Sequence, residues 1–291
     1  MVDAAARIAA VVGRSLETAR HEGRWLALGE DVVAHAADSP DEWHRLELEH
    51  RLVDRWRDAG VPVPRVLHVD TARGVQLRQR MLGLSGLQIH DERGSPLFAG
   101  PSPSARDRFD SCPLSRFGAR VAASYGEVAA RIRRAVSLDE ARAMGLGPTS
   151  RRTFDLGDAL ARLHASDASP AAKAAAVRSR AWLEALPAAD AAIHSDLHFF
   201  NLCVDANGTI TGLFDFGDSG IDAAATELLY VHSLGADFTQ CVLDAYGPID
   251  LDDVRRAHVR TALDHLIWHG PGTQRHAEVV EWATAVLERF C

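Results

Sequence analysis

Apolar residues come in short runs separated by turn residues over the first eighty positions of the chain. This pattern predicts strand and turn structure at residues 21–31, a strand at 32–36, and two more strands at 65–69 and 75–81. Residues 1–20 are expected to form an amphipathic helix or a frayed lead-in. The expected order of strand, strand, strand, helix, strand, strand describes a small mixed lobe.

The helix of this lobe has clear start and stop signals. Ser39 is a favourable N-cap, Pro40 suits the first helical position, and acidic residues follow in the first turn. Apolar residues at helical spacing predict a buried stripe, in which Glu49 falls between Leu46 and later apolar positions. The helix should run to about residue 57 and end before a glycine.

The remainder of the chain has mostly helical periodicity. Residues 83–115 are rich in glycine, serine and proline, which predicts a hinge followed by a loop. Beyond it, helices are expected at residues 117–136, 154–165, 171–186, 223–246, 251–269 and 274–290. The strands gather at the start and the helices follow, so the pattern predicts an α+β fold.

One polar loop interrupts this helical part. It carries Asp196 and, five residues later, Asn201, and it leads into a predicted hairpin of residues 202–204 and 209–214 with an Asn-Gly turn. The second strand of a hairpin returns beside the first, so Asp215 at its end should lie near the two earlier residues. A carboxylate that can accept a proton, together with an Asn/Asp pair that can bind Mg²⁺, is what phosphoryl transfer needs.

The same residues resemble the aminoglycoside phosphotransferase family, kinase-like enzymes that phosphorylate hydroxyls of small molecules. The family pattern is His-x-Asp-x-x-x-x-Asn, then a strand and Asp-(Phe/Trp)-Gly. It corresponds here to His194, Asp196, Asn201 and the run Asp215-Phe216-Gly217. The resemblance implies a bilobal, protein-kinase-like fold, with a nucleotide-binding lobe at 1–83 and a catalytic, substrate-binding lobe at 84–291. It also implies ATP or GTP and Mg²⁺ as cofactors.

The resemblance assigns roles to individual residues. Asp196 becomes the catalytic base that orients the acceptor hydroxyl, and Asn201 and Asp215 become the Mg²⁺ ligands. Asp218 either assists a second Mg²⁺ or orients the loop, or it is simply exposed to solvent. His194 is expected to fix the backbone of the catalytic loop by hydrogen bonds rather than to act as an acid or base.

The chain departs from the family at the lysine that binds the nucleotide phosphates. Glu49 stands at the place of the lysine's helix partner, but His35 fills the lysine position and no lysine precedes Lys173. We expect His35 to pair with Glu49, which would raise the pKa of the imidazole, and to contact phosphate weakly. Two alternatives stay open. An arginine could take the role, the candidates being Arg24, Arg78 and Arg80, or the lobe could bind nucleotide poorly.

The loop that would cover the phosphates is poor in glycine, and only Gly23 stands near its expected place. The net charge of -8 argues against nucleic acid as the main partner. No apolar run reaches the length of about 18 residues that a membrane span needs, and the first residues do not resemble a secretion signal. Four scattered cysteines fit a reducing cytoplasm.

Residues 181–254 contain no lysine or arginine but many acidic residues. Such a stretch would attract Mg²⁺ and a cationic acceptor such as an aminoglycoside, although for the acidic residues outside 194–222 ordinary solubilising surface charge is the simpler explanation. The resemblance therefore predicts transfer of a γ-phosphoryl group to a hydroxyl of a small molecule, for which a cationic molecule is one candidate.

Two other functions remain possible on the sequence alone. The missing lysine would suit a catalytically impaired binding or regulatory protein. Alternatively, His194, Asp196 and His198 could form a transition-metal cluster for hydrolysis, which would leave the hairpin and the Asp-Phe-Gly run unexplained.

Overall fold

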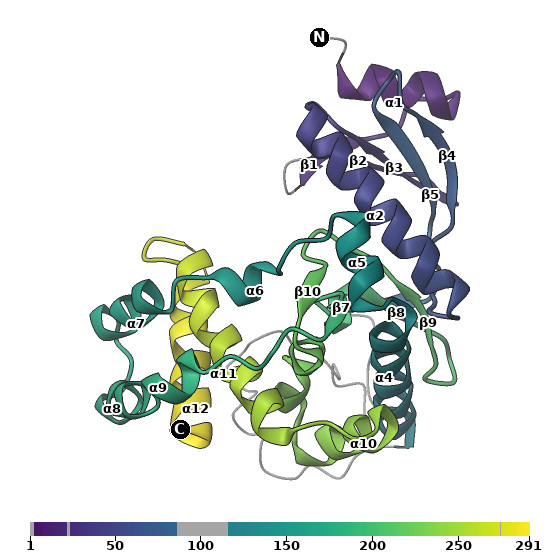
Figure 1. The fold of residues 1–291 in the computed structure, drawn as a ribbon. Helices are drawn as coiled ribbons and strands as arrows, with labels where there is room; N and C mark the ends of the chain where they lie inside the picture. The colour runs from purple at the N-terminus through teal and green to yellow at the C-terminus, as the bar shows by residue number, and fades with distance from the viewer. Residues whose placement is uncertain (1–2, 22–23, 86–115, 274) are drawn as a thin grey trace.

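Figure 1 shows the computed structural model of the chain, which describes residues 3–21, 24–85, 116–273 and 275–291. The small lobe is built on a five-stranded antiparallel sheet with the order β1-β2-β3-β5-β4. Its strands are β1 (Thr18–His21), β2 (Arg24–Leu28), β3 (Val32–Ala36), β4 (Val66–Asp70) and β5 (Val75–Gln79). The predicted α+β, bilobal architecture is confirmed.

Two helices pack on opposite faces of this sheet. Helix α1 (Ala4–Val12) covers the outer face, where Ile8 packs with small residues of β2 and β3. Helix α2 (Pro40–Asp58) lies on the inner face and begins as predicted, because the Ser39 hydroxyl accepts a hydrogen bond of 3.2 Å from the backbone N–H of Glu42. Side chains alternate along a strand, so each strand of the sheet supplies both faces.

The large lobe is mostly helical (Figure 1). Its helices are α4 (Arg116–Ala135), α5 (Leu138–Met144), α6 (Ser150–Thr153), α7 (Leu156–Ala165), α8 (Pro170–Arg178), α9 (Arg180–Glu184), η2 (Phe199–Asn201), η3 (Ala224–Leu228), η4 (Val231–Leu234), α10 (Ala236–Tyr246), α11 (Leu251–Trp268) and α12 (His276–Phe290). Its short strands are β6 (Leu84–Ser85), β7 (Ala191–Ile193), β8 (Leu202–Val204), β9 (Ile210–Leu213) and β10 (Gly220–Asp222).

Some helix predictions were wrong in detail. The single helix expected at residues 171–186 is two helices, α8 and α9, which meet at Ser179. Residues 223–246 form two short 3-10 helices before α10, because Gly235 at the start of α10 has a φ of 93° that a continuous helix excludes. Helix α5 was not expected, although Ser137 and Glu140 form a capping box at its start.

The predicted hairpin of β8 and β9 is confirmed. Its turn closes with a hydrogen bond of 3.1 Å from the backbone N–H of Gly208 to the carbonyl oxygen of Asp205, and Gly208 has a φ of 84°. Strand β10 then pairs antiparallel with β7, and Gly220 lies opposite Ile193. The chain therefore leaves β7 through the polar loop, forms the hairpin, and returns beside β7.

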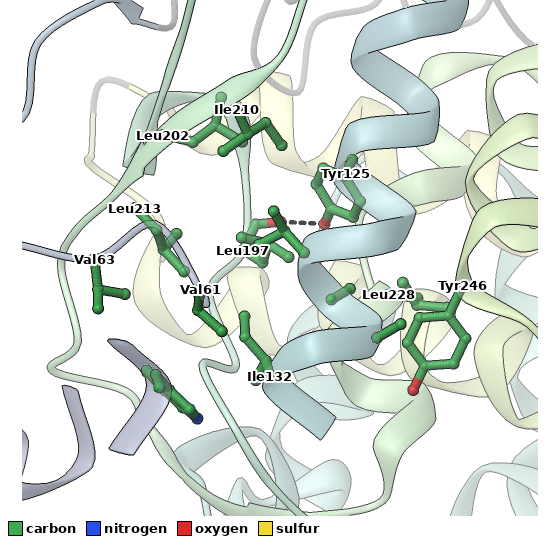
Figure 2. Packing of buried hydrophobic residues seen from close by; sticks show 14 of the residues in the cluster. Val61, Val63, Tyr125, Ile132, Leu197, Leu202, Ile210, Leu213, Leu228 and Tyr246 are labelled. Atoms are coloured by element: carbon green, nitrogen blue, oxygen red, sulfur yellow. Dashed lines mark hydrogen bonds between the residues drawn. The ribbon is translucent and has the colours of Figure 1, made fainter. Parts of the chain in front are cut away.

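One hydrophobic core extends through both lobes. Val61 and Val63, which follow α2, pack with Tyr125 of α4 and with residues of the hairpin (Figure 2). The Tyr125 hydroxyl also donates a hydrogen bond of 2.5 Å to the carbonyl oxygen of Leu197 in the polar loop, which Figure 2 marks. This packing fixes the loop against α4 and against the end of α2.

The predicted boundary between lobes at residue 83 stays a prediction. Strand β5 ends at Gln79, and β6 pairs with β8 of the large lobe. The loop predicted at 83–115 falls mostly on residues 86–115, which lie outside the described residues. Within the described ranges, no helix combines the length and apolarity that crossing a bilayer requires.

Candidate active site

The loop that carries the candidate base begins directly after β7. The buried His194 ring has its Nε2 3.0 Å from the carbonyl oxygen of Phe214, and its Nδ1 accepts a hydrogen bond of 3.3 Å from the backbone N–H of Asp196. An Nδ1 that accepts carries no proton, so the ring donates from Nε2. Burial lowers the pKa of His194, which favours this neutral form. As the sequence predicted, His194 hydrogen-bonds the loop backbone.

A buried carboxyl group holds the same loop from the other side. Glu227 of η3 accepts hydrogen bonds from the backbone N–H groups of His194 at 2.8 Å and Ser195 at 3.2 Å. Ser195 has a φ of 69°, in the left-handed region that costs a non-glycine residue about 1 kcal/mol. Burial raises the pKa of Glu227 to about 7, although the two backbone hydrogen bonds oppose this. Glu227 thus supports a strained residue immediately before Asp196.

Four donors surround the carboxylate of Asp196. Its Oδ1 accepts from the Tyr230 hydroxyl at 3.0 Å and from Arg151 Nη2 at 3.4 Å. Its Oδ2 accepts from Asn201 Nδ2 at 2.9 Å and lies 3.2 Å from His198 Nε2. Burial raises the pKa of Asp196, but the hydrogen bond and charge of His198 and the charge of Arg151 outweigh burial and hold the pKa well below its usual value. The carboxylate is therefore ionised at neutral pH.

Asn201 connects the candidate base to the hairpin. Its Nδ2 donates to both the backbone oxygen and Oδ2 of Asp196, at 3.1 and 2.9 Å, which fixes the orientation of the amide. The backbone carbonyl oxygen of Asn201 accepts a hydrogen bond of 2.9 Å from the backbone N–H of Phe214, the residue before Asp215. The three residues that the sequence predicted to meet are thereby brought to one site.

Asp215 and Asp218 face the same site. Asp215 has a φ of 63°, a conformation that few residues other than glycine adopt, and it lies at the end of β9. Burial raises the pKa of Asp218, the charge of Arg151 lowers it, and the charges of Asp196 and Asp215 raise it further. Asp218 therefore lies within the electrostatic influence of Asp196 and Asp215.

The small lobe contributes a buried ion-pair network. Glu49 of α2 accepts from Arg24 Nη1 at 2.5 Å and from Arg78 Nη2 at 3.0 Å. Burial raises the pKa of Glu49, but the charges of Arg78 and Arg24 outweigh it, so the carboxylate is ionised. Arg24 Nη2 is also 3.5 Å from Asp215 Oδ1. Arg24 therefore links the helix of the small lobe to the hairpin of the large lobe.

The expected pairing of His35 with Glu49 is wrong. Both oxygens of Glu49 accept from arginines, and no hydrogen bond joins the imidazole to Glu49 among the residues that the structure describes. The pKa of His35 is lowered rather than raised, because burial and then the charges of Arg78 and Arg24 disfavour the imidazolium. Arg24 and Arg78 are thus the partners of Glu49.

Arg80, another candidate in the small lobe, has a different partner. Arg80 instead donates from Nη1 to the carbonyl oxygen of Gly29 at 2.7 Å. Gly23 lies outside the described residues.

Sequence reasoning missed three residues of the site, namely Arg151, Glu227 and Tyr230. Arg151 comes from α6 and bridges Asp196 to Asp264 Oδ2, which it contacts at 2.5 Å. It stands 45 residues before Asp196, and Tyr230 stands 34 after it. Glu227 lies within the acidic stretch at 181–254, but no motif marks contacts between residues so far apart in the sequence.

The alternative transition-metal cluster finds no support in this geometry. Both ring nitrogens of His194 are engaged with backbone groups, so this histidine cannot join Asp196 and His198 as a metal ligand without breaking those bonds. Within the described part of the chain, no group of three His, Cys, Asp or Glu side chains is arranged to hold a metal ion.

A family model described as the phosphotransferase enzyme family matches residues 24–259. The chain belongs to this family. The matched region includes Arg24, Glu49 and the whole loop that carries Asp196 and Asn201. It also includes Arg151, Glu227 and Tyr230, whereas Asp264, the second partner of Arg151, lies just beyond it.

Solved structures share the fold of this chain at low sequence identity. The GDP complex of aminoglycoside 2'-phosphotransferase-IIIa has a TM-score of 0.69 at 15% identity, covering 98% of this chain and 97% of that one. Macrolide 2'-phosphotransferase MphH from Brachybacterium faecium has a TM-score of 0.60 at 19% identity, and the match covers 94% of this chain and 96% of that one. A choline/ethanolamine kinase family protein from Mesorhizobium loti has a TM-score of 0.56 at 19% identity, and the match covers 98% of this chain and 92% of that one. These similarities establish the kinase-like fold and leave the acceptor open.

Proposed function

We propose that the protein transfers the γ-phosphoryl group of ATP or GTP to a hydroxyl of a small molecule. The observation that carries this proposal is the hydrogen-bonded connection from Asp196 through Asn201 to Phe214. It supports the proposal because it holds Asn201 against the Asp196 carboxylate and brings the residue before Asp215 to Asn201. Phosphoryl transfer depends mainly on positioning and charge stabilisation, and this arrangement supplies the positions.

Asp196 orients the acceptor hydroxyl and accepts its proton. Because the pKa of Asp196 is held low, the carboxylate is ready to accept a hydrogen bond but is a weak base. Weak basicity suits a loose transition state, in which the hydroxyl proton is lost late. Asn201 and Tyr230 keep the carboxylate in one orientation, which makes positioning its main contribution.

The donor set fits Mg²⁺. The amide nitrogen of Asn201 faces Asp196, so the amide oxygen is the atom left to bind a cation, and Asp215 adds a carboxylate. Asp218, whose raised pKa reflects burial and the nearby Asp196 and Asp215, is a candidate for a second ion. When bound, Mg²⁺ would neutralise charge on the nucleotide phosphates.

The acidic stretch at 181–254 favours a cationic acceptor. Related folds in complexes with kanamycin and with gentamicin, and one with streptomycin and ATP, show that this architecture can bind such molecules.

The alternative function, a binding protein without transfer, rests on the missing lysine. Arg24 and Arg78 place positive charge beside Glu49, which weakens that argument. The scattered cysteines of the sequence and the proposed use of a nucleotide favour a cytoplasmic location.

The test is calorimetric titration of ATP and GTP with and without Mg²⁺, followed by transfer of labelled γ-phosphate to kanamycin, gentamicin, streptomycin, a macrolide and choline. Asp215→Ala should abolish the Mg²⁺-dependent part of nucleotide binding. Asp196→Asn should bind nucleotide normally but transfer phosphate about 10²–10⁴ times more slowly. His35→Ala should weaken nucleotide binding slightly or leave it unchanged.

Each result bears on a separate part of the proposal. Unchanged Mg²⁺ dependence in Asp215→Ala would remove Asp215 as a metal ligand. Normal turnover in Asp196→Asn would remove Asp196 as the base. If the wild-type protein binds neither nucleotide at millimolar concentration, the whole proposal fails.

A further inference from the structure

The inner face of the small-lobe sheet has no lysine where kinase-like enzymes bind phosphate. The side chain at that position on β3 is His35, which is buried and neutral because burial and two nearby arginines lower its pKa. Its Nδ1 has no hydrogen-bond partner within the described residues, nor has Nε2 of the buried Gln76, which lies directly opposite on β5. Buried polar atoms without partners are costly, which suggests that a polar ligand completes this face.

Two arginines approach this position from either side. The sheet order places β3 between β2 and β5, so Arg24 of β2 and Arg78 of β5 flank it. Both side chains reach the same face, because both donate to the carboxylate of Glu49, at 2.5 and 3.0 Å. The pair therefore brings two positive charges to one buried carboxylate.

One positive charge is enough to neutralise Glu49, so the network carries one in excess. Asp215 Oδ1 lies 3.5 Å from Arg24 Nη2 and balances this positive charge. The Nη2 end of Arg24 therefore faces Asp215. Arg24 opens β2 directly after residues 22–23, where the sequence predicts the phosphate-covering segment. Its side chain is 9% exposed, so a ligand would meet it largely desolvated.

We propose that Arg24, supported by Arg78, binds a phosphate of the nucleotide and so replaces the lysine that β3 lacks. Glu49 anchors both guanidinium groups, as it would anchor a lysine. A guanidinium can donate to Glu49 through one nitrogen and to a phosphate oxygen through another, which a single ammonium does less well at this distance. This proposal rests on the proposed nucleotide-dependent function and names the residues that recognise its polyphosphate.

The consequence is a binding defect that depends on the phosphates of the ligand. Loss of Arg24 should weaken binding of ATP or GTP but leave binding of the matching nucleoside unchanged, because the nucleoside has no phosphate. A residue that only stabilised the lobe would weaken both ligands equally. Comparing nucleotide with nucleoside therefore separates recognition from a structural role.

The experiment measures dissociation constants of ATP, ADP, AMP and adenosine, and of the guanosine series, by calorimetry. The variants are Arg24→Gln, which removes the positive charge, and Arg24→Lys, which keeps a positive charge but offers a single nitrogen in place of the planar guanidinium. The matched control is Arg73→Gln, because Arg73 pairs with Asp70 at 2.8 Å on the surface of the same lobe. Thermal unfolding establishes that each variant is folded.

We expect Arg24→Gln to bind the triphosphate about 10–100 times more weakly, as loss of a charge-assisted hydrogen bond implies. Arg24→Lys should lose less, and Arg73→Gln nothing, with nucleoside binding constant throughout. If Arg24→Gln does not fold, a triphosphate affinity of Arg24→Lys equal to wild type overturns the proposal. Equal weakening of nucleoside and triphosphate, or unchanged triphosphate affinity in Arg24→Gln, also overturns it. Absence of triphosphate binding by the wild-type protein would instead reject the proposed function itself.

Discussion

The substitution Glu227→Gln offers a quantitative test of how the catalytic loop is supported. Glu227 is completely buried and its pKa is raised from 4.5 to about 7, chiefly by burial. Glutamine has nearly the same shape and can still accept from the backbone N–H groups of His194 and Ser195 through its amide oxygen. The substitution therefore removes the titration and leaves the packing nearly unchanged.

The sign of the pH effect follows from proton binding. Between pH 4.5 and about 7, the folded protein keeps a proton on Glu227 that the unfolded chain has lost. The free energy of unfolding therefore falls as pH rises through this range and becomes constant above it. With about 1.4 kcal/mol per pKa unit, a shift of about 2.5 units corresponds to roughly 3 kcal/mol. Burial of the carboxylate thus costs the protein stability at neutral and alkaline pH.

The assay is urea unfolding of the wild-type protein and Glu227→Gln at pH 4.5 and pH 8. The other titrating groups are common to both proteins, so they cancel in the difference between the two. We expect the variant to gain about 3 kcal/mol relative to wild type between pH 4.5 and pH 8. A difference that stays the same at the two pH values would refute the reasoning, because it would mean that folding does not raise the pKa of Glu227.

Two further substitutions test packing and the site. Gly126→Ala in α4 would place its Cβ too close to the carbonyl oxygen of Val242 in α10, so we expect a loss of about 1–3 kcal/mol or more in urea unfolding, whereas the control Gly147→Ala meets nothing within 4 Å and should change little. Equal stability of these two variants would contradict the close contact of α4 with α10. Tyr230→Phe removes a donor to Asp196, so we expect kcat to fall about tenfold or more with nucleotide affinity unchanged. Wild-type kcat in that variant would show that the hydroxyl does not orient the base.

Local signals in the sequence were sufficient for much of the fold. The Ser39-Pro40 start defined α2, and the Asn-Gly turn defined the hairpin that delivers Asp215 to the site. Both signals work because the backbone conformation depends on residues within one turn of each other. The spacing from Asp196 to Asn201 is equally local, since one short loop spans it.

Contacts between distant segments were not accessible in this way. Three arginines were candidates for the partner of Glu49, and choosing Arg24 and Arg78 required the order of the strands in the sheet. The sequence favoured His35 instead, because its position matches the family lysine. The imidazole is neutral, however, as burial next to two guanidinium groups disfavours its charged form, and no local pattern reveals such an environment.

The surroundings of Asp196 indicate how an acceptor can approach the base. An ionised carboxylate has about four lone-pair sites, and four donors already lie within 3.4 Å of its two oxygens. An acceptor hydroxyl that donates to Asp196 must therefore take the place of one of these donors. Asn201 and Tyr230 make the shorter bonds, whereas His198 is 3.2 Å away with 27% of its side chain exposed, and Arg151 is 3.4 Å away. His198 and Arg151, which make the two longer contacts, are therefore the donors that a hydroxyl can replace without disturbing the groups that orient the carboxylate.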